Sequence, residues 1–159
     1  MVQWAGSVFT WPMTYKQFRT HLLAASSEPP TLYPFGLYDR AKIIGYAELS
    51  NHLHNYNSAM LSRVLISPRR RKRGLGRFMV NQLVDFGFTE LGLNRIGLGV
   101  FDFNKDAIKC YKQAGFVLEG TLRESAKAGD SYWNCHLMSI LRKEWQSQQM
   151  APAKIHKGC

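Results

Sequence analysis

A basic loop with two glycines lies between two apolar segments, and it constrains the fold more than any other part of the chain. The loop, Ser67–Phe78, reads SPRRRKRGLGRF. The preceding segment, Ala59–Ser67, is aliphatic and ends at a proline, which predicts a strand. After the loop, four apolar residues recur at helical spacing: Leu75, Met79, Leu83 and Phe86. The sequence therefore predicts a strand, a glycine turn and an amphipathic helix in succession.

Strand and helix patterns alternate along the rest of the chain. An aromatic-rich start precedes a helix for which Thr14 is the expected N-cap. The other expected elements are two strands around a turn at Asp39–Arg40, a polar loop over 51–57, a strand over Arg95–Phe103, a helix capped by Asn104 and closed by Gly115, and a final antiparallel pair joined by 125–130. This order predicts one mixed α/β domain over residues 1–145, followed by a polar, flexible tail over 146–159.

Composition excludes several classes of protein. No apolar run approaches the roughly 18 residues that a membrane helix needs. The N-terminus lacks the pattern of a secretory signal. The chain has 3 cysteines and no C-x-x-C pair, so neither a disulfide framework nor a zinc site is indicated. We predict an intracellular, cytoplasmic protein without a metal.

The positive charge is concentrated in the basic loop. The net charge is +10, and seven of the Lys and Arg side chains lie between Arg63 and Arg77, where there is no Asp or Glu. A helix N-terminus offers unpaired N–H groups, glycines let the backbone approach an anion, and arginines add charged donors. The loop thus fits a phosphate cradle. A solvated charge run and a nucleic-acid patch are the alternatives.

Two motifs together resemble the GNAT superfamily of acyl-CoA-dependent N-acyltransferases. The first is R-x-x-G-x-G, formed by Arg71, Gly74 and Gly76. The second is the pattern N-x-x-A-x-x-x-Y-x-x-x-G-F, formed by Asn104, Ala107, Tyr111, Gly115 and Phe116. The resemblance runs from about Pro34 to Trp145. It is closest to the branch that contains the ribosomal-protein N-terminal acetyltransferases and spermidine acetyltransferase.

The resemblance implies a fold, a reaction and a set of site residues. The fold is a mixed, mostly antiparallel sheet flanked by helices, and the reaction is acetyl transfer from acetyl-CoA to an amine in a ternary complex. The residues implied to hold acetyl-CoA are Leu65, Ile66, Arg71, Lys72, Arg73, Gly74, Leu75, Gly76, Arg77, Asn104 and Tyr111. Tyr111 is also implied to donate a proton or hydrogen bond to the departing thiolate.

The acceptor amine and its base are less constrained by the sequence. An amine must be neutral to attack, so a lysine-like amine needs a base more than an α-amine does. Glu48, near the end of a predicted strand, is the first candidate base, with a solvent-facing strand residue as its alternative; Glu119 is a second candidate. Five aromatic residues either line the acceptor pocket or belong to the core: Trp4, Trp11, Tyr15, Tyr33 and Phe35.

One departure from the family concerns the N-terminus. The family begins with an extra strand before the segment that resembles residues 4–14; either this chain lacks that strand or sequence upstream of Met1 is missing. The strand over 32–38 would then have an open edge, which favours pairing with a second copy in a homodimer. Two other functions stay open: a basic nucleic-acid-binding module, and a GNAT-like protein that binds acyl-CoA without chemistry.

Overall fold

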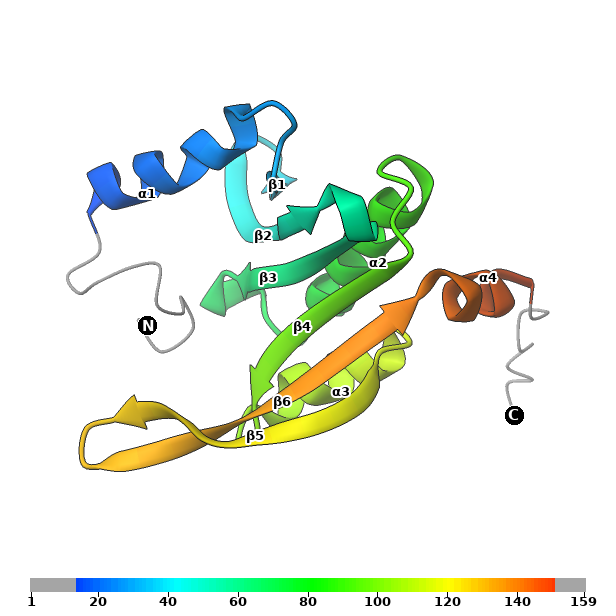
Figure 1. Cartoon of the computed structure of the whole chain (residues 1–159). Helices are drawn as coiled ribbons and strands as arrows, with labels where there is room; N and C mark the ends of the chain where they lie inside the picture. The colour runs from blue at the N-terminus through cyan, green and yellow to red at the C-terminus, as the bar shows by residue number, and fades with distance from the viewer. Residues whose placement is uncertain (1–13, 151–159) are drawn as a thin grey trace, which may run out of the picture.

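The computed structural model describes residues 14–150, which form one six-stranded sheet with helices on both faces (Figure 1). The helices are α1 (Tyr15–Leu22), α2 (Leu75–Thr89), α3 (Lys105–Gln113) and α4 (Arg142–Met150). The strands are β1 (Leu32–Asp39), β2 (Lys42–Leu53), β3 (Ser58–Ile66), β4 (Arg95–Phe101), β5 (Val117–Ala128) and β6 (Ser131–Leu141). Short 3-10 helices lie at Leu23–Ser26, His54–Tyr56 and Pro68–Arg70. None of the helices within residues 14–150 is both long and apolar enough to span a bilayer.

The sheet consists of two antiparallel halves. The strand order is β1-β2-β3-β4-β6-β5, and only the central pair, β3 and β4, is parallel. This confirms the expected mixed, mostly antiparallel α/β fold. Strand β1 lies at one edge of the described sheet. The expectation about a first strand concerns residues before 14, which lie outside the described part of the chain. The predicted pocket residues Trp4 and Trp11 lie outside it as well.

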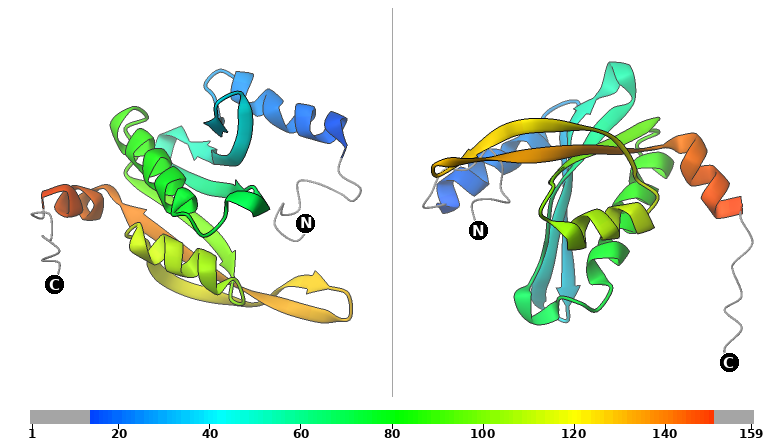
Figure 2. Two further views of the ribbon diagram at one scale, coloured as in Figure 1. Left: turned by 180° about the vertical axis from the view of Figure 1, so that it is seen from behind. Right: turned by 90° about the horizontal axis from the view of Figure 1, so that it is seen from below.

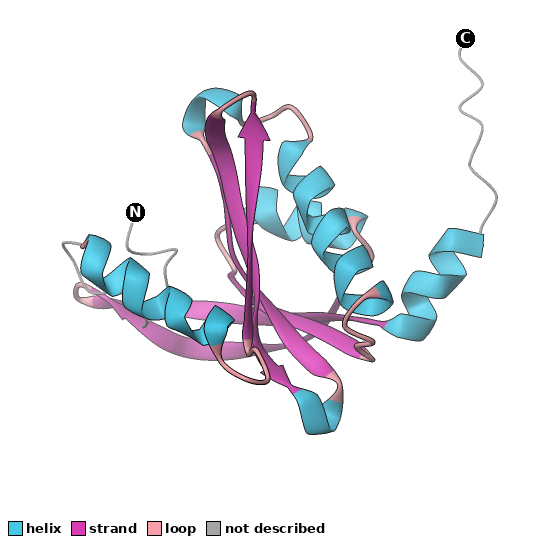
Figure 3. Ribbon diagram, turned by 90° about the horizontal axis from the view of Figure 1, so that it is seen from above, coloured by secondary structure: helices cyan, strands magenta, loops and turns pink. Residues whose placement is uncertain are grey.

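The core lies between the sheet and helices α2 and α3, which pack side by side on one face (Figure 2). Helix α1 lies on the opposite face (Figure 3). Buried apolar side chains come from the central strands and from α2: Ala47, Leu49, Leu61, Val80, Leu83, Val84, Phe88, Ile96, Leu98, Met138 and Ile140. Gly87 lets α2 approach the sheet closely, since a Cβ there would lie 2.8 Å from Ile96 Cδ1.

Local signals place the helix ends as expected. Thr14 is the N-cap of α1 and forms a capping box with Gln17. Asn104 is the N-cap of α3, and Gly115, with φ of 96°, follows its end. Each of these residues satisfies helix-end groups that would otherwise lack a partner.

Three expectations about loops were wrong. Residues 51–53 belong to β2 and His52 is buried, because a register shift after Ser50 lets the strand continue. The final strands extend to Ala128 and Ser131, so only a tight turn joins them. Residues 146–150 are helical in α4, where a flexible tail was expected.

Among residues 14–150 there is no group of His, Cys, Asp and Glu that could hold a metal ion.

Candidate active site

The two halves of the sheet separate between β3 and β4. These strands pair only through Ser58–Met60 and Arg95–Gly97. Beyond that ladder β3 continues to Ile66 and β4 to Phe101 without pairing to each other, and the two strands visibly diverge (Figure 1). Their facing main-chain groups are therefore available to an extended ligand that carries amide groups of its own.

The N-terminus of α2 lies beside the end of β3. Its N-cap, Gly74, has φ of 74°, and Lys72 has φ of 58°. The first bond of the helix runs from the Phe78 N–H to the Gly74 carbonyl at 3.0 Å. The N–H groups of residues 75–77 make no hydrogen bond to other described residues. This geometry, which Gly74 reaches without strain, presents donors and a positive dipole end to an anion.

The cations of the basic loop divide into two groups. Two of them hold the loop in place: Arg71 Nε donates to the Ile66 carbonyl at 3.1 Å, and Arg70 forms an ion pair with Asp39 of β1. Arg71 is itself exposed, as are the other cations of the loop, Arg69, Lys72, Arg73 and Arg77. The guanidinium of Arg71 thus ties the end of β3 to the loop, while its exposed neighbours surround the N-terminus of α2.

Gly76 has room for a Cβ inside this loop. A Cβ there would meet its nearest neighbours, Cys110 Sγ and Ile66 Cγ1, at 3.9 Å, which is ordinary contact. Packing within the protein therefore does not require a glycine, whereas close approach of a ligand to the backbone would. The Cys110 thiol belongs to α3, so α2, α3 and β3 meet at this point. Burial raises the pKa of Cys110, and nearby Arg77 partly offsets that effect.

Helix α3 carries Asn104 at its N-cap and Tyr111 about two turns further along. Asn104 Oδ1 accepts the Ala107 N–H at 3.3 Å, which leaves its amide N–H groups for a ligand. The Tyr111 ring is half-buried, 5.9 Å from the Phe116 ring, and its hydroxyl has no hydrogen-bond partner among residues 14–150. Burial, and then Cys110, raise the pKa of Tyr111. Tyr111 is therefore a neutral donor at physiological pH.

Glu48 is fully buried, at 0% exposure, on the face of the sheet covered by α1. Its carboxylate accepts from three side chains. Tyr46 donates its hydroxyl at 2.6 Å, His21 Nε2 lies 3.0 Å from Oε2, and Arg63 forms an ion pair with Oε1. The alternative of a solvent-facing strand glutamate was therefore wrong. Burial and the hydrogen bond to Glu48 raise the pKa of Tyr46, so Tyr46 keeps its proton and acts as a donor.

The sequence did not indicate the partners of Glu48. In the sequence, Arg63 belongs to the positively charged stretch that ends at Arg77. The one signal for a separate role is that Arg63 directly precedes the three aliphatic residues 64–66. The helical pattern that predicts the first helix does not single out His21 as a site residue. Only the folded chain brings α1, β2 and β3 together at this carboxylate.

Glu119 has a different environment. Arg95 donates two hydrogen bonds to it, both at 2.6 Å, and the Ser139 hydroxyl donates a third at 2.8 Å. These bonds lower the pKa of Glu119 to about 2. A carboxylate held this strongly in its charged form is a poor proton acceptor at neutral pH. Glu119, Arg95 and Ser139 belong to β5, β4 and β6, so these bonds link the three strands. Glu119 is therefore a structural residue and a poor candidate for the general base.

The predicted aromatic pocket is not assembled as a unit. Tyr33 and Phe35 pack against Phe86 of α2, with ring centroids 6.0 Å and 5.0 Å apart, so they belong to the core side of the sheet. Tyr15 is exposed on α1. Of the two alternatives, the core placement is confirmed for Tyr33 and Phe35.

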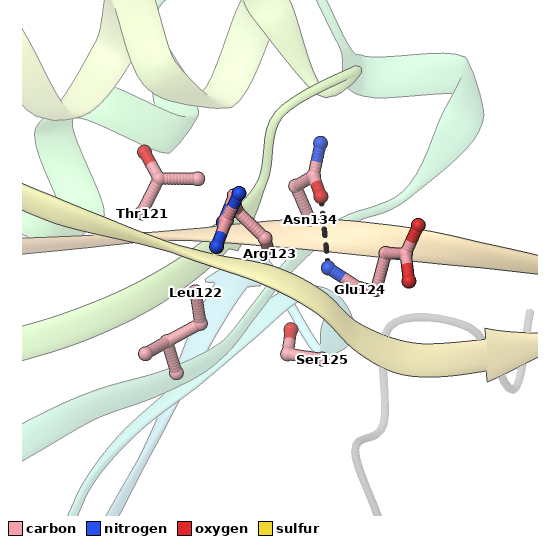
Figure 4. A pocket seen from close by; sticks show the side chains of 6 residues that line it. All are labelled: Thr121, Leu122, Arg123, Glu124, Ser125 and Asn134. Carbon is pink, nitrogen blue, oxygen red and sulfur yellow. Dashed lines mark hydrogen bonds between the residues drawn. The ribbon is translucent and has the colours of Figure 1, made fainter.

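An open pocket lies on the β5–β6 hairpin instead (Figure 4). Its lining residues are Thr121, Leu122, Arg123, Glu124, Ser125 and Asn134. It forms where β5 bulges at Glu124, whose φ is 51° and whose N–H donates to Asn134 Oδ1 at 2.9 Å. Asn134 also donates to Asp102 Oδ2 at 2.9 Å, which ties the bulge to the end of β4. The end of the hairpin projects to the side on which α1 lies (Figure 3).

Comparison with known proteins agrees with this geometry. The acetyltransferase (GNAT) family matches residues 2–116. This chain belongs to that family. Among curated GNAT relatives, spermidine N(1)-acetyltransferase of Vibrio cholerae is 32% identical over 103 residues, covering 65% of this chain and 59% of the relative. The Escherichia coli K12 enzyme of the same name is 28% identical over 116 residues, covering 73% and 60%. The alignments thus span about three fifths of these two relatives.

Solved structures of GNAT proteins extend the likeness over more of the chain. A spermidine N-acetyltransferase mutant from Vibrio cholerae superposes with a TM-score of 0.77 at 26% identity, covering 86% of this chain and 80% of that one. The Vibrio cholerae enzyme in complex with CoA and spermine superposes with a TM-score of 0.76 at 25% identity, covering 84% and 78%. The fold of this chain is therefore the GNAT fold.

Proposed function

We propose that this GNAT protein is an N-acetyltransferase that moves an acetyl group from acetyl-CoA to an amine. The observation that carries the proposal is the opening between β3 and β4, which leads to the free N–H groups at the start of α2. A strand edge suits an amide-containing arm, and a helix N-terminus with exposed cations suits a pyrophosphate. The solved complex of a similar protein with CoA supports the same assignment.

The predicted site residues take consistent roles in this proposal. Main-chain groups of Leu65 and Ile66 and the amide of Asn104 would hold the pantetheine arm. The loop residues Arg71, Lys72, Arg73, Gly74, Leu75, Gly76 and Arg77 would hold the phosphates. Acetyl-CoA supplies an activated acetyl group as a thioester. Tyr111 would donate a hydrogen bond to the sulfur, since its raised pKa keeps the phenol protonated.

For the acceptor we propose an aliphatic amine of the polyamine class. The names of the two bacterial relatives and the spermine complex of a similar structure support it. The amine would approach from the face that carries α1 and the hairpin, since α2 and α3 cover the other face (Figure 3). The net charge of +10 opposes a polycation at long range, and the phosphates of bound acetyl-CoA offset part of it.

Calorimetric titration with acetyl-CoA at physiological salt tests the cofactor site. We expect saturable one-site binding that Arg71→Ala/Gly74→Ala removes and Gly76→Ala weakens. Gly120→Ala is the matched control, because Gly120 has open space around it and lies on β5, away from the loop. Absence of binding, with duplex DNA bound in a strongly salt-dependent way instead, would support the nucleic-acid alternative.

We also propose that the protein assembles into a homodimer or a larger oligomer through the β1 edge. Strand β1 is eight residues long and unpaired on one side within the described sheet. A similar spermidine N-acetyltransferase from Vibrio cholerae forms a dodecamer. Light scattering of the wild type and of Tyr38→Glu, on the exposed end of β1, tests the idea: a monomeric wild type contradicts it.

A further inference from the structure

The buried carboxylate of Glu48 joins three separate elements. We name Glu48, His21, Tyr46 and Arg63 the Glu48 cluster. His21 belongs to α1, Glu48 and Tyr46 to β2, and Arg63 to β3. The side chains of His21 and Arg63 are each only 12% exposed. Glu48 itself is 0% exposed, so its partners are these protein side chains and not bulk water.

Arg63 lies at a break in the backbone of β3. Its φ is 53°, in the left-handed region that a long side chain rarely adopts. Tyr46 is paired with Leu65, and Glu48 with Ser62, so Arg63 and Val64 together lie opposite Ala47. This is a β-bulge, which re-aims the backbone of one strand relative to its neighbour. The ion pair with Glu48 holds the side chain of the residue at which the bulge occurs.

The bulge lies where the cofactor opening begins. Strand β3 pairs with β4 only up to Met60, and the bulge follows three residues later. The residues just beyond it, Leu65 and Ile66, lie on the part of β3 that does not pair with β4 and so borders the opening. A change in the bulge would rotate those peptide groups, because a one-residue shift in a strand exchanges its two edges and faces.

The same carboxylate also holds helix α1. Among residues 14–150, no side chain of α1 is buried. Its described contacts with the sheet run through the edge-to-face pair Phe18–Tyr46, at 5.8 Å, and through His21 and Glu48. The Glu48 cluster therefore connects the helix on the acceptor side with the strand on the cofactor side.

We propose that Glu48 is a positioning residue and not the general base: through Arg63 it fixes the bulge of β3 that presents main-chain groups to acetyl-CoA, and through His21 it fixes α1 over the acceptor side. This inference rests on the proposed acetyltransferase function. It assigns Arg63 and His21 roles that differ from each other. Arg63 acts on cofactor binding, and His21 acts on acceptor binding.

Steady-state kinetics and calorimetry of Glu48→Gln and Arg63→Lys test the assignment. We expect each to weaken acetyl-CoA binding by about tenfold, while the acidic limb of the kcat/KM pH profile keeps its wild-type position. His21→Ala should raise KM for the amine and leave the acetyl-CoA Kd unchanged. Glu119→Gln and Arg95→Lys are the matched controls, because they alter an Arg–Glu pair elsewhere in the sheet. We expect wild-type constants for both.

A second measurement is independent of turnover. Since a buried unpaired charge can prevent folding, each variant is first compared with the wild type by hydrogen exchange. We expect faster exchange at residues 63–66 in Glu48→Gln and Arg63→Lys, with the α2 core unchanged. A Glu48→Gln protein that binds acetyl-CoA normally, but loses kcat and the acidic limb of the profile, would show that Glu48 is the base. A wild type that neither binds acetyl-CoA nor acetylates amines would refute the proposed function, whereas normal exchange at 63–66 would refute the positioning role alone.

Discussion

The environment of Tyr111 suits its hydroxyl to donate a proton and not to accept one. The half-buried ring keeps its proton because burial raises its pKa, so it can donate to a developing thiolate but cannot serve as a base. Its position on α3 places it about two helical turns after Asn104, the N-cap of the same helix. A donor of this kind acts late in the reaction and contributes little to binding of the thioester.

Tyr111→Phe should lower kcat by about 100-fold and leave the acetyl-CoA Kd unchanged, because only the hydroxyl is removed. Release of the CoA thiol in the presence of spermidine measures turnover, and calorimetry measures binding. Tyr132→Phe, at an exposed tyrosine of the hairpin, should behave as the wild type. A Tyr111→Phe protein with full activity would remove the tyrosine from the mechanism, and a wild type that binds acetyl-CoA but acetylates no amine would favour the non-catalytic alternative.

The ion pair between Glu119 and Arg95 should make a small, pH-dependent contribution to stability. The pKa of Glu119 is lowered to about 2 in the folded protein, against about 4.3 in an unfolded chain. A lowered folded-state pKa gives stability that is present above pH 4.3 and is lost as the pH falls towards 2.

Denaturant unfolding of the wild type and of Glu119→Gln measures this effect. At pH 7 the wild type should be more stable by less than about 1 kcal/mol, because the pair is partly exposed. The difference should shrink below pH 4. A difference that is constant between pH 7 and pH 3 would show that the charge of Glu119 does not contribute.

At the scale of one element, helix α2 carries two glycines that differ in the space around them. Gly87 is required by packing against the sheet, whereas packing does not require Gly76. A Cβ at Gly87 would lie 2.8 Å from Ile96 and 3.1 Å from Leu93, both buried, whereas a Cβ at Gly76 would meet nothing closer than 3.9 Å. Alanine also favours a helix over glycine by about 1 kcal/mol. The two substitutions should therefore change stability in opposite directions.

Gly87→Ala should reduce the free energy of unfolding by about 1 to 2 kcal/mol, because overpacking exceeds the gain in helix propensity. Gly76→Ala should leave it unchanged or raise it by up to about 1 kcal/mol while weakening acetyl-CoA binding. Chemical denaturation and calorimetry on both variants measure the pair of effects. If Gly76→Ala binds acetyl-CoA as tightly as the wild type, the cofactor does not approach the backbone closely at this glycine.

The order of elements was predictable from the sequence, whereas the connections across the sheet were not. Thr14 and Asn104 announce helix starts through signals within a few residues, and the apolar spacing of α2 is equally local. Two of the three partners of Glu48, His21 and Arg63, lie 27 and 15 positions away in the sequence. Bulges at Arg63 and Glu124 depend on strand pairing, and no local pattern specifies them.

At the scale of the whole molecule, α4 belongs to the domain. Trp145 Nε1 donates to Asp85 Oδ1 at 2.7 Å, and its ring lies 5.3 Å from that of Phe88. Arg142 Nε donates to the Leu93 carbonyl at 2.7 Å. The predicted domain ended at Trp145 because the following residues are polar, yet the helix continues to Met150.

Trp145→Ala should reduce the free energy of unfolding by about 2 kcal/mol, since it removes a packed aromatic ring and leaves Asp85 without its donor. Urea denaturation followed by circular dichroism measures the loss. Gln146→Ala, at an exposed position of the same helix, should lie within about 0.5 kcal/mol of the wild type. Equal stability of Trp145→Ala and the wild type would place α4 outside the folding unit.

Strands β3 and β4 pair only through Ser58–Met60 and Arg95–Gly97. A cofactor bound beyond this ladder would bridge the two halves of the sheet and stabilise their association. Ligand and fold would then be thermodynamically linked. At a concentration 100 times Kd, acetyl-CoA would add about 2.7 kcal/mol to the stability of the folded state, which is a rise in melting temperature of about 5 to 10 °C. The thermal melt of the protein should therefore report on cofactor occupancy, and acyl-CoA analogues could be ranked by heating the chain without knowing its acceptor.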